Sequence, residues 1–193
     1  SMPTRKRQQD KVKYAPVASD RSLLEQAEAT LLRIYLHCPE YRQAVTDALL
    51  ERDLQFSLSH HRFLWQQILE LVASIPTASR SATTQTQIEL ISSLQVRYLE
   101  FETEMAQVAY LFHLDEKTQH DLLRATQLIQ AATACMERVM CEQRHRYFLQ
   151  LWEQTDPASD PDQYQSYYES LSQEKQRLQE LDRQRQFSLI DLI

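Results

Sequence analysis

The chain of 193 residues contains no glycine. Proteins contain roughly 7% glycine on average. Tight hairpins and phosphate-binding loops need residues that adopt a positive φ at no steric cost. The absence therefore argues against P-loop and Rossmann nucleotide sites and against the strained turn that carries a catalytic serine in many hydrolases.

Cysteines and long apolar runs are also scarce. The cysteines, Cys38, Cys135 and Cys141, make an odd count without a paired framework, which is typical of reduced thiols. The sequence contains neither a secretory signal nor an apolar run of the roughly 18 residues that a membrane span requires. These absences lead us to expect a cytoplasmic protein that does not associate with membranes.

The formal net charge is −6, which disfavours a surface that coats nucleic acid. The beginning of the chain is the exception, because its charged residues are mostly basic: Arg5, Lys6, Arg7, Asp10, Lys11 and Lys13. We expect residues 1–19 to form a basic, flexible tail.

Leu, Gln, Glu, Arg and Ala are abundant, and all favour helices. Apolar residues make up 42% of the chain, which is enough to support a core. The composition therefore predicts an all-α fold.

Start and stop signals divide the first half of the chain into helices. Ser22 and Glu25 form a capping box, and Pro39 ends the helix that follows and begins a short one. Ser59 is expected to cap a third helix that stops at Pro76. Residues 76–85 read as a polar, mobile loop, and a second capping box runs from Thr86 to Glu89.

The second half contains a longer helical pattern. Asp115 is expected to cap a helix that runs without a breaker from about residue 116 to 154, and Asp160-Pro161 begins a last helix that ends near Phe187. The predicted architecture is a helical bundle over residues 20–141, joined by the long helix to a two-helix hairpin over residues 142–193.

Three groups of polar residues resemble chemical sites, but each has a simpler structural interpretation. His60 and His61 are adjacent, so a helix would point them about 100° apart and make a shared metal ion difficult. Cys141 and His145 lie one helical turn apart without further ligands, and Asp160-Pro-Asp162 is explained by a turn and a helix cap. We expect no catalytic residue, no metal and no cofactor in this chain.

The hairpin is expected to expose apolar residues that bind a partner, because two helices alone bury little surface. The expected partner-binding residues are Phe148, Trp152, Tyr164, Tyr168, Leu171, Leu178, Phe187, Leu189 and Ile190. The last three belong to an apolar chain end, F-S-L-I-D-L-I.

Three segments carry a resemblance to a known family. They are A-E-A-T-L-L-R-I-Y-L-H-C-P-E-Y (27–41), D-L-Q-F-S-L-S-H-H-R-F-L-W-Q-Q-I (53–68) and R-L-Q-E-L-D-R-Q-R-Q-F-S-L-I-D-L-I (177–193). The first two resemble the C-terminal domain of bacterial DnaG-type primases, and the third resembles the end of cyanobacterial primases. In that pattern His61-Arg62 marks the start of a helix.

The resemblance implies a non-catalytic domain of a longer primase whose zinc-binding and polymerising domains precede Met2. It implies that the hairpin docks on the N-terminal collar of the replicative DnaB-type helicase while the bundle modulates helicase activity. The alternatives are the N-terminal domain of the helicase itself and a helical adaptor. We expect a monomer when alone, without a small-molecule substrate and without direct nucleic-acid binding.

Overall fold

A computed structural model of the chain describes residues 17–75 and 83–185, and all regular structure in these residues is helical. The all-α prediction is confirmed. The elements are α1 (Val17–His37), η1 (Pro39–Tyr41), α2 (Arg42–Glu51), α3 (Ser59–Ser74), α4 (Thr83–Glu100), α5 (Glu102–Ala106), η3 (Ala109–Phe112), α6 (Glu116–Asp121), η4 (Leu122–Arg124), α7 (Ala125–Gln154) and α8 (Pro161–Arg185). Among these helices, none is long and apolar enough to serve as a membrane span.

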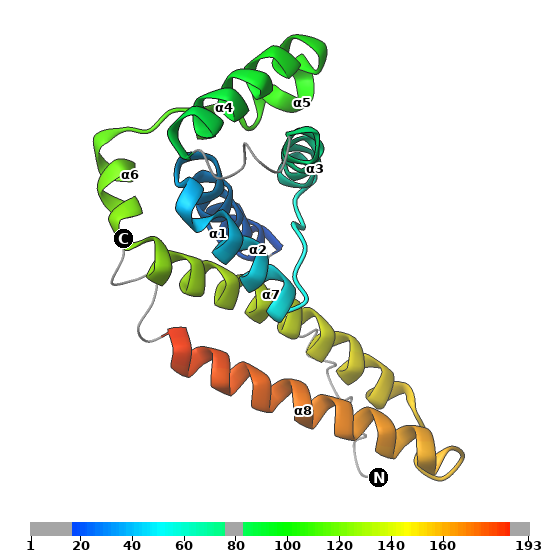
Figure 1. Ribbon diagram of the computed structural model, residues 1–193. Coiled ribbons are helices and arrows are strands. Elements are labelled where there is room, and N and C mark those ends of the chain that lie inside the picture. Colours follow the sequence, from blue (N-terminus) through cyan, green and yellow to red (C-terminus); the bar gives the residue numbers. More distant parts are fainter. Residues whose placement is uncertain (1–16, 76–82, 186–193) are drawn as a thin grey trace, which may run out of the picture.

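Helix α1 is the centre of the bundle and packs against α2, α3, α4 and α7 (Figure 1). Its sequence is apolar around most of its circumference, as a helix with neighbours on several sides requires. Leu31, Leu32, Ile34 and Leu36 are all fully buried. This arrangement makes α1 the element through which α3 and α7 are held in one body.

The turn after α2 shows how a chain without glycine ends a helix. Asp53 adopts a left-handed conformation with φ 51°. The amide of Leu54 donates to the Leu49 carbonyl at 2.8 Å, and the amide of Asp53 donates to the Leu50 carbonyl at 3.1 Å. This is the Schellman pattern, in which glycine is the usual residue and aspartate is one of the few tolerated substitutes.

Two of the expected helix starts are confirmed by side-chain caps. The carboxylate of Asp115 accepts the amide of Thr118 at 2.7 Å, and the carboxylate of Asp160 accepts the amide of Gln163 at 3.2 Å, one residue before α8 begins at Pro161. Pro39 begins the 3₁₀ turn η1, as expected.

Two other expected starts and one expected cap are wrong. Helix α1 begins at Val17, so Ser22 lies inside it, and α4 begins at Thr83, three residues before the expected capping box. Helix α3 begins at Ser59, and its N-cap is Leu58, which makes no side-chain capping bond. The tail predicted for residues 1–19 overlaps α1 by three residues, and its other residues, 1–16, lie outside the described residues. Residues 76–82 of the predicted loop also lie outside them.

The helical stretch from 116 to 154 is divided. Helix α6 ends at Asp121, and a 3₁₀ turn over Leu122–Arg124 precedes α7, which contains 30 residues. Arg124 leaves helical geometry, with φ −109° and ψ 35°. No proline marks this break in the sequence, and it allows α6 to turn away from the axis of α7 (Figure 1).

Helices α7 and α8 form an antiparallel hairpin that projects from the bundle (Figure 1). Leu181 near the end of α8 is buried against Ala134 and Cys141 of α7. Helix α8 therefore packs along α7 well before residue 142, where the hairpin was expected to begin. The first half of α7 contacts the bundle on one side and α8 on the other.

Candidate protein-docking surface

The turn of the hairpin is held by one aspartate. Asp156 accepts the amide of Ala158 at 2.9 Å through Oδ1 and the hydroxyl of Ser159 at 2.7 Å through Oδ2. These hydrogen bonds to the charged form lower the pKa of the Asp156 carboxyl. The amide of Asp160 also donates to the Asp156 carbonyl at 3.0 Å, so the turn leads directly into the capped start of α8.

Six aromatic side chains lie in the last turns of α7 and the first turns of α8, in two groups of three rings in contact. They form the hairpin aromatic cluster: Tyr147, Phe148 and Trp152 of α7 and Tyr164, Tyr167 and Tyr168 of α8. The ring of Trp152 lies 5.3 Å from that of Tyr164 and 6.1 Å from that of Tyr168. Such spacings are typical of attractive aromatic pairs, so the cluster stabilises the end of the hairpin.

The same cluster faces solvent. Tyr147 is 58% exposed and Tyr168 is 51% exposed. Tyrosine and tryptophan are enriched at the centres of protein interfaces because they bury a large area and lose little side-chain entropy. A rigid hairpin that presents partly exposed aromatic rings has the chemistry of a docking surface.

An ion-pair node connects the hairpin to the end of α2. Glu137 of α7 accepts from Arg177 of α8 at 2.6 Å and from Arg52, next to α2, at 3.0 Å. The Glu137 side chain is only 11% exposed. A carboxylate in such a position is stable because two guanidinium groups bind it.

Further ion pairs continue along both helices. Arg138 pairs with Asp182 at 2.7 Å, and Arg144 pairs with Glu174 at 2.9 Å. Arg146 of α7 reaches Asp20 of α1 at 3.1 Å. These pairs hold the register of α8 on α7 and connect the hairpin to α1.

The structure divides the residues that were expected to bind a partner. Tyr168 is exposed, and Phe148, Trp152 and Tyr164 are partly buried in the hairpin aromatic cluster. Leu171 is buried, with 9% of its surface exposed, and Leu178 packs against the small core formed by Ala134, Cys141 and Leu181. These two leucines therefore stabilise the hairpin, whereas Phe187, Leu189 and Ile190 lie outside the described residues.

His60 and His61 lie in the first turn of α3 and their rings are 4.2 Å apart. The expectation that the two imidazoles diverge is wrong, because both rings turn toward one carboxylate of α1. Nε2 of His60 lies 2.9 Å from Oε1 of Glu25, and Nε2 of His61 lies 3.5 Å from the same oxygen.

Glu28 is the functional group that the sequence interpretation missed. Its fully buried carboxylate accepts the amides of Ser57 at 2.8 Å and Leu58 at 3.2 Å, and Nδ1 of His61 at 3.0 Å. Glu28 thus holds the two residues that precede α3 and the ring of His61, and it anchors the start of α3 from another helix. The only signal in the sequence is a charged residue at a position of α1 whose neighbours along the helix are apolar.

The other candidate ligands form ordinary polar contacts. Nη2 of Arg144 lies 3.3 Å from Sγ of Cys141, and Arg144 also pairs with Glu174, so a guanidinium already occupies one side of this thiol. Burial raises the pKa of Cys141. Asp160 caps α8, as described above.

Comparisons with known proteins place the chain beside DNA-replication enzymes. It is 38% identical over 164 residues to a DNA primase of Synechocystis, a match that covers 85% of this chain and 25% of that protein. It is 36% identical over 143 residues to a DNA primase of Synechococcus elongatus, covering 69% of this chain and 20% of that protein. No family model matches the chain, and no solved structure matches it.

The described residues form an all-α body with a projecting hairpin. The similarities confirm the resemblance to cyanobacterial DNA primases: this chain is related to one region of these proteins. The chain spans about a quarter or less of the curated relatives that it matches.

Proposed function

We propose that this chain is a non-catalytic helicase-binding domain, which docks a primase on the N-terminal collar of the replicative DnaB-type helicase. The observation that carries the proposal is the hairpin aromatic cluster, with Tyr147 and Tyr168 about half exposed on a hairpin held by ion pairs. The relationship to one region of DNA primases supports a replication partner for this surface.

Docking through the hairpin leaves the bundle free to act on the helicase. The node of Arg52, Glu137 and Arg177 links the two parts, so a partner that binds the hairpin would also position the bundle. We propose that the bundle modulates helicase activity in that position. A catalytic role is not part of the proposal, because polymerisation is expected in other domains of the parent protein.

The experiment compares two matched pairs of exposed apolar residues. Calorimetric titration of the helicase N-terminal domain into the chain would be done with Tyr147→Ser/Tyr168→Ser and with Val96→Ser/Leu99→Ser. Val96 and Leu99 are 65% and 75% exposed on α4 and are therefore as accessible as the tyrosines. The tyrosine pair should weaken binding by about tenfold or more, since aromatic anchors contribute strongly to interfaces.

The α4 pair should leave the affinity within about twofold, because rim and distant residues contribute little. The reverse result would place docking on the bundle and contradict the proposal. Equal affinity of all three proteins would also contradict it. Circular dichroism of each variant would show that helix content is kept.

The alternative, that the chain is a helicase N-terminal domain, makes a different prediction. Such a domain would associate with itself through the hairpin. Sedimentation of the chain alone would then show oligomers that the tyrosine substitutions dissociate. The similarity to primases favours the docking domain.

A further inference from the structure

Three possible metal ligands meet between α1 and α3. Glu25, His60 and His61 bring one carboxylate oxygen and two imidazole nitrogens within 4.8 Å of one another. His60 is 8% exposed and His61 is fully buried. The group therefore lies at the edge of the core and not on an open acidic surface.

The tautomer of His61 follows from its neighbours. The carboxylate of Glu28 accepts the amides of Ser57 and Leu58, so it also accepts from Nδ1 of His61, which must carry a hydrogen. In a neutral imidazole the other nitrogen, Nε2, then has a free lone pair. Nε2 is buried and has no hydrogen-bond partner.

This lone pair points toward another acceptor. Oε1 of Glu25 lies 3.5 Å from Nε2 of His61 and 2.9 Å from Nε2 of His60. Two electron pairs that face each other in a buried position repel, unless a proton or a metal cation lies between them. On the other side of the ring, the carboxylate of Glu28 accepts from Nδ1 of His61. In many zinc sites a carboxylate in this position orients the imidazole that binds the metal.

The distances are close to those around a tetrahedral ion. Zinc binds histidine nitrogen and carboxylate oxygen at about 2.0–2.2 Å, so its ligands lie about 3.3–3.6 Å from one another. The separation of 3.5 Å between Glu25 and His61 lies in this range, and that of 2.9 Å between Glu25 and His60 is shorter by about 0.4 Å. Small rotations of Glu25, whose side chain is 39% exposed, suffice to adjust them.

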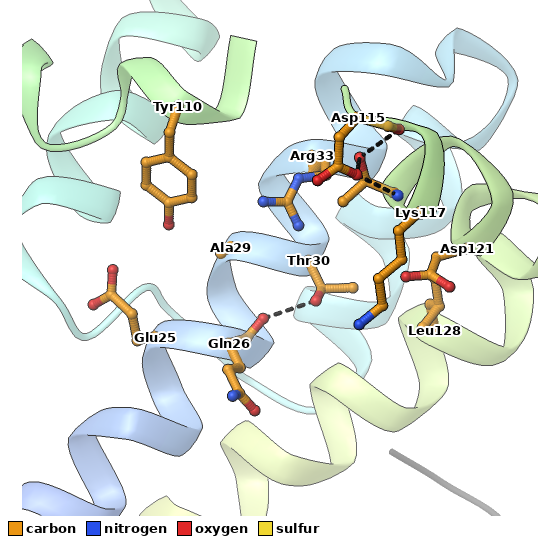
Figure 2. A pocket seen from close by; sticks show the side chains of 11 residues that line it. Glu25, Gln26, Ala29, Thr30, Arg33, Tyr110, Asp115, Lys117, Asp121 and Leu128 are labelled. Carbon is orange, nitrogen blue, oxygen red and sulfur yellow. Dashed lines mark hydrogen bonds between the residues drawn. The ribbon is translucent and has the colours of Figure 1, made fainter. Parts of the chain in front are cut away.

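Of the three residues, Glu25 also lines a pocket of about 410 Å³, together with Ala29, Arg33 and Tyr110. Figure 2 shows the Glu25 carboxylate and the Tyr110 ring on the same side of this pocket, while Lys117, Asp115 and Asp121 lie toward the other side. Burial raises the pKa of Tyr110, and the negative charge of Glu25 raises it further. Water would supply the fourth ligand beside Glu25, whose side chain is 39% exposed.

We propose that Glu25, His60 and His61 bind one divalent transition-metal ion of the zinc class, with Glu28 as the residue that orients His61. The ion joins α1 to the first turn of α3. The site does not depend on the proposed docking function, since it lies in the bundle and the docking surface lies on the hairpin.

The test uses the full chain after treatment with a chelator. Zn²⁺ titration in a non-coordinating buffer should show one equivalent bound with a Kd of about 1 µM or below. Co²⁺ should give the visible absorption of a low-coordinate site. Glu25→Gln and His60→Gln should each weaken binding at least about tenfold, and Glu28→Gln should weaken it by about tenfold without changing the stoichiometry.

Two control variants distinguish this site from other residues that could bind a metal. His120→Gln on the exposed surface of α6 should bind as tightly as the unmodified chain, and so should Cys141→Ser/His145→Gln. Loss of binding in the cysteine variant would move the site to α7 and overturn the proposal. Binding that survives both Glu25→Gln and His60→Gln would overturn it as well.

A measurement on the unmodified chain covers the case in which a variant fails to fold. Co²⁺ should shift the imidazole nitrogen resonances of His60 and His61 and leave those of His113 and His120 in place. The metal site would be refuted if the chain took up no Zn²⁺ at about 10 µM. If the nitrogen resonances then showed a doubly protonated His61, the group would be an imidazolium–carboxylate pair.

Discussion

Arg177 of α8 donates to both carboxylate oxygens of Glu137 on α7, from Nε at 3.1 Å and from Nη2 at 2.8 and 2.6 Å. The guanidinium thus binds the carboxylate as a planar fork, which a lysine cannot reproduce. Arg52 holds the same carboxylate from the bundle at 3.0 Å. The Glu137 carboxylate therefore connects α8 to the residue that follows α2.

Arg177→Ala should lower the free energy of unfolding by about 1–3 kcal/mol, because it leaves the largely buried Glu137 with one cationic partner. Arg177→Lys should recover less than half of the loss. The matched control is Arg183→Ala on the same helix, whose pair with Glu180 is exposed and should contribute less than about 0.5 kcal/mol. Urea unfolding measures the free energy of unfolding of all three variants. Equal losses of stability in Arg177→Ala and Arg183→Ala would contradict the role of Arg177 in the ion-pair node.

Asp53→Gly should raise the free energy of unfolding by about 0.5–1 kcal/mol. Asp53 has φ 51°, a conformation that glycine adopts without the steric cost of a Cβ atom. Asp53→Ala keeps the Cβ atom and loses the polar side chain, so it should not stabilise the protein. Thermal unfolding of the two variants distinguishes an effect of the backbone from an effect of the lost charge. Stabilisation of both variants would mean that removal of the charge, and not the backbone conformation, is the cause.

His37 should make the protein less stable in mild acid. Burial lowers its pKa from the ordinary 6.5, and the positive charges of Arg33, His113 and Arg42 lower it further, against the hydrogen bond from Nε2 to the Leu111 carbonyl. The unfolded chain therefore binds the proton more readily below about pH 6.5, so the free energy of unfolding falls as the pH falls through that value.

The variant His37→Gln removes this titration and keeps a hydrogen-bond donor. Its free energy of unfolding should change less than that of the unmodified chain between about pH 7.5 and 5.5. Because both proteins keep the other histidines and all carboxylates, the difference between the two curves isolates His37. Parallel curves would show that His37 keeps its ordinary pKa.

Deletion of residues 187–193 should weaken binding to the helicase N-terminal domain by about thirtyfold, which corresponds to about 2 kcal/mol. The reason is the apolar composition of this chain end, with Phe187, Leu189 and Ile190 among its residues. Calorimetry gives the affinity and circular dichroism the helix content. Unchanged affinity with unchanged helix content would restrict docking to the hairpin aromatic cluster.

Local signals in the sequence predicted much of the fold. A chain without glycine and rich in helix formers is all-α, and the caps at Asp115 and Asp160 stand where their sequence pattern indicates. These features depend on residues that lie within about four positions of one another, so a linear sequence contains all the information they require.

The tertiary structure alone decided which groups meet. Glu28 anchors the residues before α3 from 29 and 30 positions away, and Arg177 binds Glu137 across 40 positions. The burial of Leu171, the break before α7 and the convergence of Glu25 with His60 and His61 depend in the same way on how whole helices pack. A buried carboxylate binds whichever donors the packing brings to it, and no local pattern in the sequence specifies which donors those are.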